Sequence, residues 1–548
     1  MNSIKKNYVD LVIFFYFFVF FVIGLITAKD YGIHIEEKFH RSNGFYWLNY
    51  LLSFTNLDQL KDVSLDKYNK IYDYTLSQVS HYNKYGIIFD VPAALLELLL
   101  KIDEPKKYYQ LRHLLSFIFF FIGSVFFFKI LMNRFKKKDI SLIGTSFYIL
   151  SPRIYGDSFL YKDIIFLSIS TISIYFFFKV IDKFSYKNII FFALSASAAT
   201  SARIIGIYFP IILVVLFLIE ILNKKGNKEY LIKNLLFLLF FFFFLIIQWP
   251  YLWQSPFNNF LLLFNSLKTD LISVKILFDE KFISNEFMPL NYLHTWIFIS
   301  TPPLHTILFC LGYFYLFKRF LFKFLNIENK SKFDDFWHSK NEKKDFTILI
   351  TFTSIFIFII IQNIKLYNGW RLVYFLNIFL VYIITYFLYL FFFKIKSFKK
   401  KTFFYLVLII IFSMIIQKMI VYHPFQSLYF NSLITKKAKN SYEGDYHGLG
   451  GSKFLFEISK DNSEIINIAV ASHTPLQRSK EFIDIELGKF INIVGQEYYK
   501  ADYIYKNNIS EVNSYLNKKY DIPNDFIKIE EFIIDGISIY EIYKKTIK

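Results

Sequence analysis

The chain has 548 residues, 55% of them hydrophobic and 22% aromatic, and many of its apolar runs approach the roughly 20 residues that cross a hydrocarbon layer. This composition predicts a polytopic α-helical membrane protein. The formal net charge of +19 comes from Lys and Arg clustered between the apolar runs, which the positive-inside rule expects and which argues against nucleic-acid binding. The single cysteine, Cys310, excludes an internal disulfide and a cysteine-rich metal site.

The first apolar run, Leu11–Ala28, follows two lysines and lacks a small-residue cleavage site, so we expect a retained span with its amino end in the cytoplasm. It leads directly into an acidic stretch, Asp30–Arg41. The carboxylates of this stretch are Asp30, Glu36 and Glu37. Charges at the end of a span cost free energy unless they are paired, so the stretch is a candidate functional site. The alternative is a solvated loop that only ends the helix.

Residues 29–110 are expected to form a long external loop, because their mixed apolar and charged pattern predicts amphipathic helices on the membrane surface. Within this loop the turn Asn83-Lys84-Tyr85-Gly86 carries a cation, although a single lysine in a loop is usually only solvated. Two spans are expected next: 114–132, which ends at the basic run Arg134–Lys138, and 140–150, which returns outward.

The segment Ser151–Asp163 follows as a tight loop beside the bilayer that contains Pro and Gly. Its charged residues are Arg153, Asp157, Lys162 and Asp163. Rigid loops that hold charges against a membrane are better candidates for a functional site than long flexible ones. The alternative is that ion pairs between these residues only cap the ends of two helices.

Two arginines interrupt the positive-inside pattern, because Arg203 and Arg371 lie at the external ends of predicted spans. Each therefore requires an anionic partner on the external side, either a carboxylate or a phosphate. Further along the chain, Pro302 and Pro303 are expected to kink a span, and such kinks usually line a cavity.

The remaining spans are expected at residues 164–181, 189–202, 204–222, 235–253, 296–317, 346–361, 372–393 and 403–421. Together with those above, they give about 11 spans, place every dense basic loop in the cytoplasm and leave the carboxy-terminal part outside. The sequence therefore predicts a membrane domain, residues 1–435, and a small external α/β domain, residues 436–548. The α/β fold is predicted from strand-like runs at 465–471, 490–494 and 501–506 and a hairpin at 532–543.

Seven segments, in order along the chain up to about residue 450, resemble the membrane glycosyltransferases of the GT-C fold, specifically the bacterial branch related to dolichyl-phosphate-mannose protein mannosyltransferases and to the aminoarabinose transferases of lipid A. The segments are Asp30–Glu37, Ser151–Asp163, Thr200–Arg203, Trp249–Trp253, Thr301–Pro303, Tyr367–Arg371 and His423–Gly448. These families carry an Asp-Glu pair in the first external loop, where this chain has Glu36-Glu37. The longer side chain shifts the carboxylate by about 1.5 Å, which matters for the geometry of attack.

The resemblance implies inverting transfer of a sugar from a polyprenyl-monophosphate donor to an acceptor on the external face of the membrane. Glu36 is the expected general base, with Glu37 and Asp30 holding the acceptor or the first loop. A phosphate leaving group is stabilised by cations rather than by a proton donor. The expected phosphate ligands are Arg203 and Arg371 in the first rank, and Lys84, Arg153 and Lys162 in the second. Asp163 is expected to orient Lys162 or the first loop.

A divalent metal ion would find oxygen ligands in Asp30, Glu36, Asp157 and Asp163. Because relatives with monophosphate donors generally work without a metal, no metal and no other cofactor is expected. The expected partners are the polyprenyl-phosphate sugar, a glycan, lipid or protein acceptor, and the lipids of a plasma (inner) membrane.

Two other functions stay open. A transporter or flippase of a lipid-linked sugar would also need cations and an apolar groove. Transporters usually show internal repeats and mid-membrane sites, whereas this sequence has no repeat that we find and its charges cluster at one face. A scaffold whose external domain binds envelope partners would not need the acidic first loop.

Overall fold

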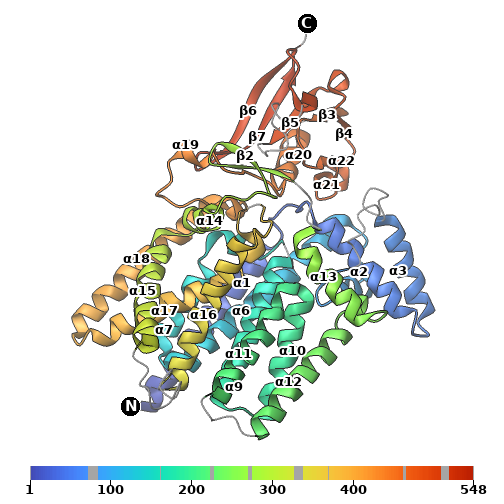
Figure 1. Ribbon diagram of the computed structural model, residues 1–548. Coiled ribbons are helices and arrows are strands. Elements are labelled where there is room, and N and C mark those ends of the chain that lie inside the picture. The colour runs from blue at the N-terminus through green and yellow to red at the C-terminus, as the bar shows by residue number, and fades with distance from the viewer. Residues whose placement is uncertain are drawn as a thin grey trace.

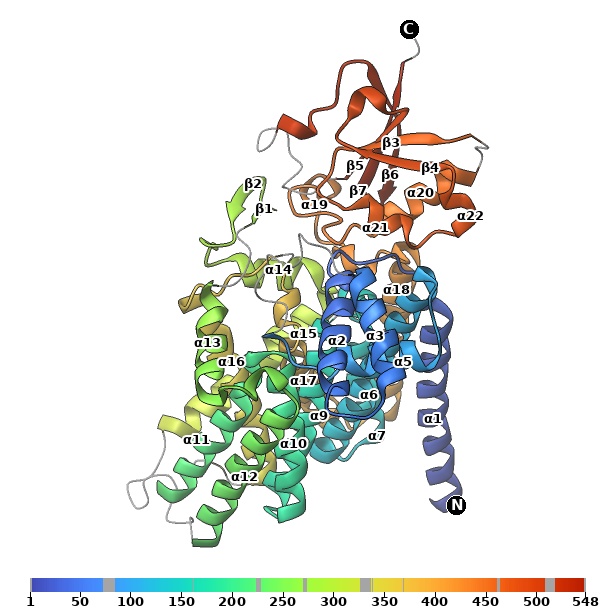
Figure 2. The same ribbon diagram turned by 90° about the vertical axis from the view of Figure 1, so that its right-hand side faces the viewer.

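The computed structural model describes most of the chain, and the turn residue Asn83 of the first loop lies outside the described part. The described residues are 2–71, 84–160, 162–222, 228–269, 274–325, 337, 339–367, 369–460, 464–507 and 518–546. A helical bundle carries a smaller domain with a β-sheet at one end, and the amino terminus lies at the other end (Figures 1 and 2). We call the two ends of the bundle the domain end and the opposite end.

Within the described residues, nine helical segments are long and apolar enough to cross a membrane. They are α1 (Asn2–Thr27), α6 (Pro105–Phe135), α9 (Lys162–Asp182), η2 with α11 (Ile204–Ile207 and Tyr208–Leu222), α12 (Lys228–Ile247), α15 (Pro303–Leu325), α16 (Lys340–Ile361), α17 (Leu376–Lys394) and α18 (Phe398–Tyr422). The predicted polytopic helical protein is therefore confirmed. Two further predicted spans are the shorter helices α7 (Lys138–Ile149) and α10 (Tyr186–Ala202), so the count of about 11 stays a prediction.

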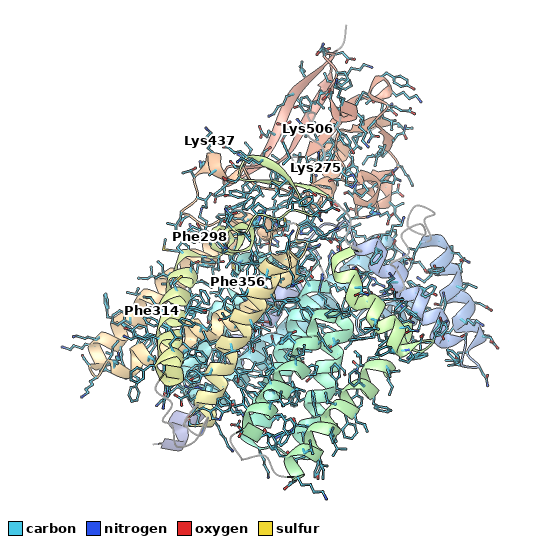
Figure 3. All side chains as sticks on the ribbon, viewed as in Figure 1. Lys275, Phe298, Phe314, Phe356, Lys437 and Lys506 are labelled. Carbon is cyan, nitrogen blue, oxygen red and sulfur yellow. The ribbon has the colours of Figure 1, made fainter. Side chains whose placement is uncertain are left out.

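The bundle has a buried centre and an apolar outer face. In the most apolar 18-residue stretch of α9, and likewise of α17, 72% of the residues are buried. In the corresponding stretches of α1 and α18 only 11% and 17% are buried. An all-round apolar helix fits both places, because lipid replaces the core on the outer side. Small residues let the central helices approach closely: a Cβ added to Gly123 of α6 would lie 3.1 Å from Ser168 of α9. Phe314 and Phe356 mark this bundle in Figure 3, and Lys437 and Lys506 lie in the smaller domain.

Short elements form a layer at the domain end of the bundle. They are α2 (Glu37–Leu52), α3 (Asp58–Ile71), α5 (Asp90–Leu99), α8 (Pro152–Asp157), η3 (Pro250–Leu252), α13 (Pro256–Thr269), the hairpin β1 (Lys275–Phe278) and β2 (Lys281–Ser284), α14 (Tyr292–Ser300), η4 (Arg371–Val373) and η5 (Gln426–Leu428). Helices α2, α3 and α5 share an apolar cluster that includes Phe45, Leu52 and Leu98. The helix predicted to kink at Pro302 and Pro303 is broken between α14 and α15.

The C-terminal domain contains a mixed five-stranded sheet, as the predicted α/β fold requires. Its elements are α19 (Lys436–Lys439), α20 (Gly450–Lys460), β3 (Ile466–Val470), α21 (Leu476–Lys480), α22 (Ile485–Gly488), β4 (Ile491–Gly495), η6 (Tyr498–Lys500), β5 (Tyr503–Asn507), η8 (Lys518–Tyr520), β6 (Phe526–Ile534) and β7 (Ile537–Lys545). The strand order is β4-β3-β5-β7-β6, in which β3 pairs in parallel with β4 and β5 while β7 pairs antiparallel with β5 and β6. Asp535 and Gly536 turn the last hairpin with φ values of 49° and 85°, which suits an Asp-Gly turn.

A network of buried ion pairs joins the helices at the opposite end. Asp345 of α16 is fully buried and accepts hydrogen bonds from Arg134 of α6, at 2.6 and 2.5 Å, and from the hydroxyl of Tyr382 of α17, at 2.7 Å. One residue earlier, Lys344 pairs with Asp182 of α9 at 2.5 Å. The network joins the four helices α6, α9, α16 and α17. Separating these ion pairs would be costly, because no water inside the bundle could replace a lost partner.

We expect Asp345→Ala to lower the stability of the purified protein by about 3–5 kcal/mol, because the substitution leaves the guanidinium of Arg134 buried without its carboxylate. Thermal unfolding in detergent measures the effect as a fall in Tm. The matched control is Asp66→Ala, which breaks an exposed pair with Lys70 and should change stability by no more than about 0.5 kcal/mol. Equal Tm values for the two variants would contradict a buried network.

Candidate functional site

The buried guanidinium of Arg371 is the centre of a charged cluster at the domain end. Residue 371 opens η4, the short turn that precedes α17, and its side chain is 1% exposed. One terminal nitrogen donates to Glu36 Oε1 at 3.0 Å, the other lies 3.1 Å from His34 Nε2, and Nε lies 3.3 Å from Asp163 Oδ2. Burial by itself would lower the pKa of Arg371, but Glu36 and Asp163 raise it, so the group stays cationic. The cluster thereby joins the first loop, α9 and η4.

Glu36 differs from the other carboxylates of the cluster because its side chain is 26% exposed. It lies in the turn between α1 and α2, one residue before α2 begins. Burial of the rest of the carboxyl group would raise its pKa, but the charges of Arg371 and His40 and the hydrogen bond from Arg371 together lower the pKa below its usual value. Glu36 is therefore an anion that an incoming molecule can reach, and it is held in place from one side by a buried cation.

Asp163 pairs with both arginines that interrupt the positive-inside pattern. It lies in the first turn of α9, its side chain is 1% exposed, and it forms ion pairs with Arg371 and with Arg203. Arg203 follows α10 directly and is 22% exposed. The anionic partner that the sequence requires for each arginine is therefore a carboxylate of the chain itself in this structure. Arg203 keeps one side open to a further anion, whereas Arg371 is enclosed.

Lys162 borders the same cluster without joining its ion pairs. Its ammonium lies 3.2 Å from the centre of the Tyr85 ring and has no hydrogen-bond partner among the described residues. It lines a cavity of about 20 Å³ between α2, α5 and α6, which is large enough for one water molecule. Among the described hydrogen bonds and ion pairs, none joins Asp163 to Lys162. The described ion pairs of Asp163 are with Arg203 and Arg371.

The wall of this cavity contains charged residues that sequence reasoning missed. Arg112 of α6 is 4% exposed, its three side-chain nitrogens have no hydrogen-bond partner within the described chain, and its nearest carboxylate is that of Glu97 at 3.7 Å. His113 follows it and binds Glu37. A signal was present, because Arg112 and His113 open a long apolar run, where a charge at the end of a span indicates a site.

Glu37 and Asp30, the other two predicted catalytic carboxylates, lie apart from Glu36 in their contacts. Glu37 is buried, accepts from the backbone nitrogen of His34 at 2.7 Å and contacts His113 Nε2 at 2.9 Å, so it fixes the loop to α6. Asp30 contacts His423 Nε2 at 3.0 Å and thereby joins the end of α1 to the end of α18. The structure thus brings neither carboxylate into the ion pairs around Arg371.

The remaining two predicted phosphate ligands have structural contacts. The carbonyl oxygen of Lys84 accepts from the indole of Trp249 at 2.8 Å, and the Lys84 side chain is half-buried. Arg153 is 5% exposed, donates to the carbonyl of Tyr429 at 2.8 Å and stacks on Trp296, with its guanidinium carbon 4.9 Å from the ring centre. Arg153 therefore supports the packing between α8, α14 and the segment after α18 rather than the Arg371 cluster.

His34, His447 and the carboxylate of Asp157 lie next to the Arg371 cluster. The rings of His34 and His447 lie 3.9 Å apart, and burial first, with nearby cations second, keeps the pKa of both imidazoles well below its usual value. Asp157 is buried beside them, accepts from the hydroxyl of Tyr374 at 2.8 Å, and its pKa is raised by burial to about 6. The sequence names Asp157 as a possible metal ligand, and His34 and His447 lie in segments that it singles out, but it assigns no role to either histidine or to Tyr374.

Metal binding finds no support in the geometry. Across the part of the chain that the structure describes, no three His, Cys, Asp or Glu side chains form a group that could hold a metal ion. Of the four possible ligands in the sequence, Asp30 pairs with His423, Asp157 with Tyr374, and Glu36 and Asp163 share Arg371. That the protein works without a metal stays a prediction.

Comparison with known proteins gives similarities only at the level of structure. No family model matches the chain, and no curated protein sequence matches it. Two crystal structures of ArnT from Cupriavidus metallidurans are similar at 9% identity. For the apo state the TM-score is 0.47, with 98% of this chain and 98% of ArnT covered. For the state bound to undecaprenyl phosphate the TM-score is 0.43, with 97% and 98% covered.

The raised pKa of Asp157 predicts a pH-dependent stability. An aspartate that titrates at about 6 in the folded protein and near 3.8 when unfolded penalises the folded state above pH 6, and the penalty disappears as the pH falls towards 4. Asp157→Asn keeps an oxygen that can accept from Tyr374 and removes the titration. We expect the variant to be more stable than the native protein by about 2–3 kcal/mol at pH 7.5, and the two Tm values to converge between pH 6 and 4. A difference that does not change with pH would contradict the assignment.

Proposed function

We propose that the protein is a membrane glycosyltransferase of the GT-C type that takes a sugar from a polyprenyl-monophosphate donor and transfers it, with inversion, to an acceptor at the domain end. The observation that carries this proposal is the arrangement around Arg371. It offers a reachable carboxylate anion, Glu36, and a half-open arginine, Arg203, at the end of an apolar bundle, and a single carboxylate, Asp163, links the two. Base and anion site thus lie side by side where a lipid-linked substrate leaves the bilayer.

The chemistry assigns one role to each group. The acceptor oxygen attacks the anomeric carbon from the face opposite the phosphate, and its proton passes to the carboxylate of Glu36. The bond between the anomeric carbon and the phosphate oxygen breaks, and its electron pair stays on the polyprenyl phosphate. Arg203 stabilises the charge that develops there, because guanidinium hydrogen bonds to phosphate strengthen in a site with little water.

Arg371 has a supporting role in this scheme. Because it is enclosed and already binds two carboxylates, it is less suited than Arg203 to receive a phosphate directly. It keeps Glu36 ionised and oriented until the acceptor arrives, and a base must be unprotonated before it can act. Lys162 lies beside the cluster, and its ammonium has no hydrogen-bond partner in the described part of the chain, so it is the second candidate to bind the phosphate. We place the domain end on the external side of a plasma (inner) membrane, with the amino terminus in the cytoplasm.

A panel of polyprenyl-phosphate sugars, incubated with the purified protein and an acceptor mixture in detergent, tests the proposal. We expect release of polyprenyl phosphate that survives a chelator. Glu36→Gln should reduce the release by about 10²- to 10⁴-fold in a protein that still folds, because the amide keeps the shape of the side chain and loses its basicity. Normal turnover by this variant would move the base to Glu37 or Asp30.

The matched control is Glu486→Gln, which changes an exposed glutamate of α22 and should leave turnover unchanged. Movement of intact donor across liposome membranes with no glycosidic bond broken would instead favour a flippase, because a transferase consumes its donor.

The binding of polyprenyl phosphate alone tests the role of Arg203. We expect Arg203→Ala to weaken this binding by about 2–4 kcal/mol, because the phosphate loses a partly buried charged partner. Titration followed by intrinsic tryptophan fluorescence gives the Kd. Arg319→Ala, which removes a half-exposed arginine of α15 paired with Glu342, is the control and should bind normally. Equal Kd values for all three proteins would show that Arg203 is only structural.

A further inference from the structure

The backbone of the loop that carries Glu36 is held by the C-terminal domain on both sides. The nitrogen of Ile35 donates to the carbonyl of His447 at 3.2 Å. The carbonyl of Ile35 accepts a hydrogen bond from the guanidinium of Arg478. Gly32 of the same loop lies very close to the segment before α20. A Cβ added to this glycine would be 2.9 Å from the carbonyl oxygen of Leu449. The peptide unit next to Glu36 is therefore fixed by residues more than 400 positions later in the sequence.

The element that carries Arg478 is itself docked on the membrane domain. Figure 2 shows α21 above the end of the bundle where α2 and α5 lie. Immediately after α21, Phe482 packs against Ile33 of the loop and Tyr109 of α6, and Glu481 accepts from the hydroxyl of Tyr109 at 3.2 Å. Because these contacts anchor α21 to α6, the bond from Arg478 to the loop is made from a fixed support.

The second contact of the domain reaches the cluster through histidine rings. The ring centre of His447 lies 3.9 Å from that of His34, with the two rings tilted by 42°, and His34 Nε2 lies 3.1 Å from a terminal nitrogen of Arg371. Arg371 in turn binds Glu36. The C-terminal domain therefore touches the loop at the backbone of residue 35 and the cluster at His34, which are the two residues directly before Glu36.

We propose that Arg478 is a positioning residue for the transfer reaction, so that the C-terminal domain holds the general base in its working place. This inference rests on the proposed function of Glu36. Arg478 touches neither substrate nor carboxylate; it fixes the carbonyl before Glu36, and a displacement of about 1 Å at a base costs on the order of 10²-fold in rate. The binding of the donor does not depend on this bond, because the phosphate-binding arginine lies on another part of the chain.

Two measurements on the full-length protein test the inference. We expect Arg478→Gln to lower kcat by about 10- to 100-fold with the Kd for polyprenyl phosphate unchanged, and Arg478→Lys to recover part of the loss, because lysine still donates to a carbonyl. Hydrogen–deuterium exchange should become about tenfold faster in the peptide that contains residues 33–37 of Arg478→Gln and stay unchanged in the sheet of the C-terminal domain. The control is Lys480→Gln, which changes a cation on the same helix. Its ammonium donates to the carbonyl of Ile491 at 2.6 Å, within the C-terminal domain.

The two measurements separate failure of this inference from failure of the proposed function. If the native protein consumes a donor while Arg478→Gln keeps both its kcat and its slow exchange at residues 33–37, the positioning role is wrong. If Arg478→Gln and Arg478→Lys lose Tm and exchange rapidly throughout the C-terminal domain, Arg478 only stabilises that domain, and the positioning role is again wrong. If the native protein consumes no donor, the proposed function fails, and the exchange at residues 33–37 still decides whether Arg478 holds the loop.

Discussion

The enclosed guanidinium of Arg371 is the constraint on which the domain end depends. A cation that is 1% exposed at the edge of an apolar bundle is tolerated only with carboxylates around it, and the two that bind it come from the first loop and from α9. These contacts decide where Glu36 lies, and they draw Asp163 into the position from which it also binds Arg203. One buried charge therefore arranges an anionic group and a cationic group beside each other, which is the pairing that the proposed transfer from a polyprenyl phosphate needs.

Charged residues occupy the two ends of the bundle and serve different purposes there. At the opposite end, Arg134 and Tyr382 both donate to Asp345, and the result is a rigid joint between helices. At the domain end the balance is incomplete: Arg112 and Lys162 keep nitrogens without hydrogen-bond partners among the described residues, next to a cavity that is large enough for one water molecule. Unsatisfied buried donors cost free energy, and an active site is where such a cost is retained.

Patterns within single segments were enough to predict much of the fold. Apolar run length located the nine long helices, and alternation with an Asp-Gly turn located the β6–β7 hairpin. The positive-inside pattern singled out Arg203 and Arg371, which the structure links through one carboxylate. The ion pairs themselves could not be read from the sequence, because they join residues 36, 163, 203 and 371, which are far apart along the chain. The sequence does not tell which of the several external carboxylates binds each arginine. For the same reason the contacts of Arg478 and His447 with the first loop could not be predicted.

The carboxylates of the first loop show why tertiary contacts, rather than residue type, divide structural from chemical roles. Asp30, Glu36 and Glu37 have the same chemistry and lie within eight residues of one another. Glu37 is buried, and its oxygens bind a backbone nitrogen and an imidazole. Asp30 binds His423 at the junction of two helices. Glu36 alone is bound on one side by a cation that must stay charged and is open on the other. A general base needs both properties, because it must be deprotonated and the acceptor hydroxyl must be able to reach it. Glu36 gains them from Arg371, and two hydrogen bonds from the C-terminal domain hold the backbone beside it. The proposed general base is therefore a product of the assembled protein rather than of the loop that contains it.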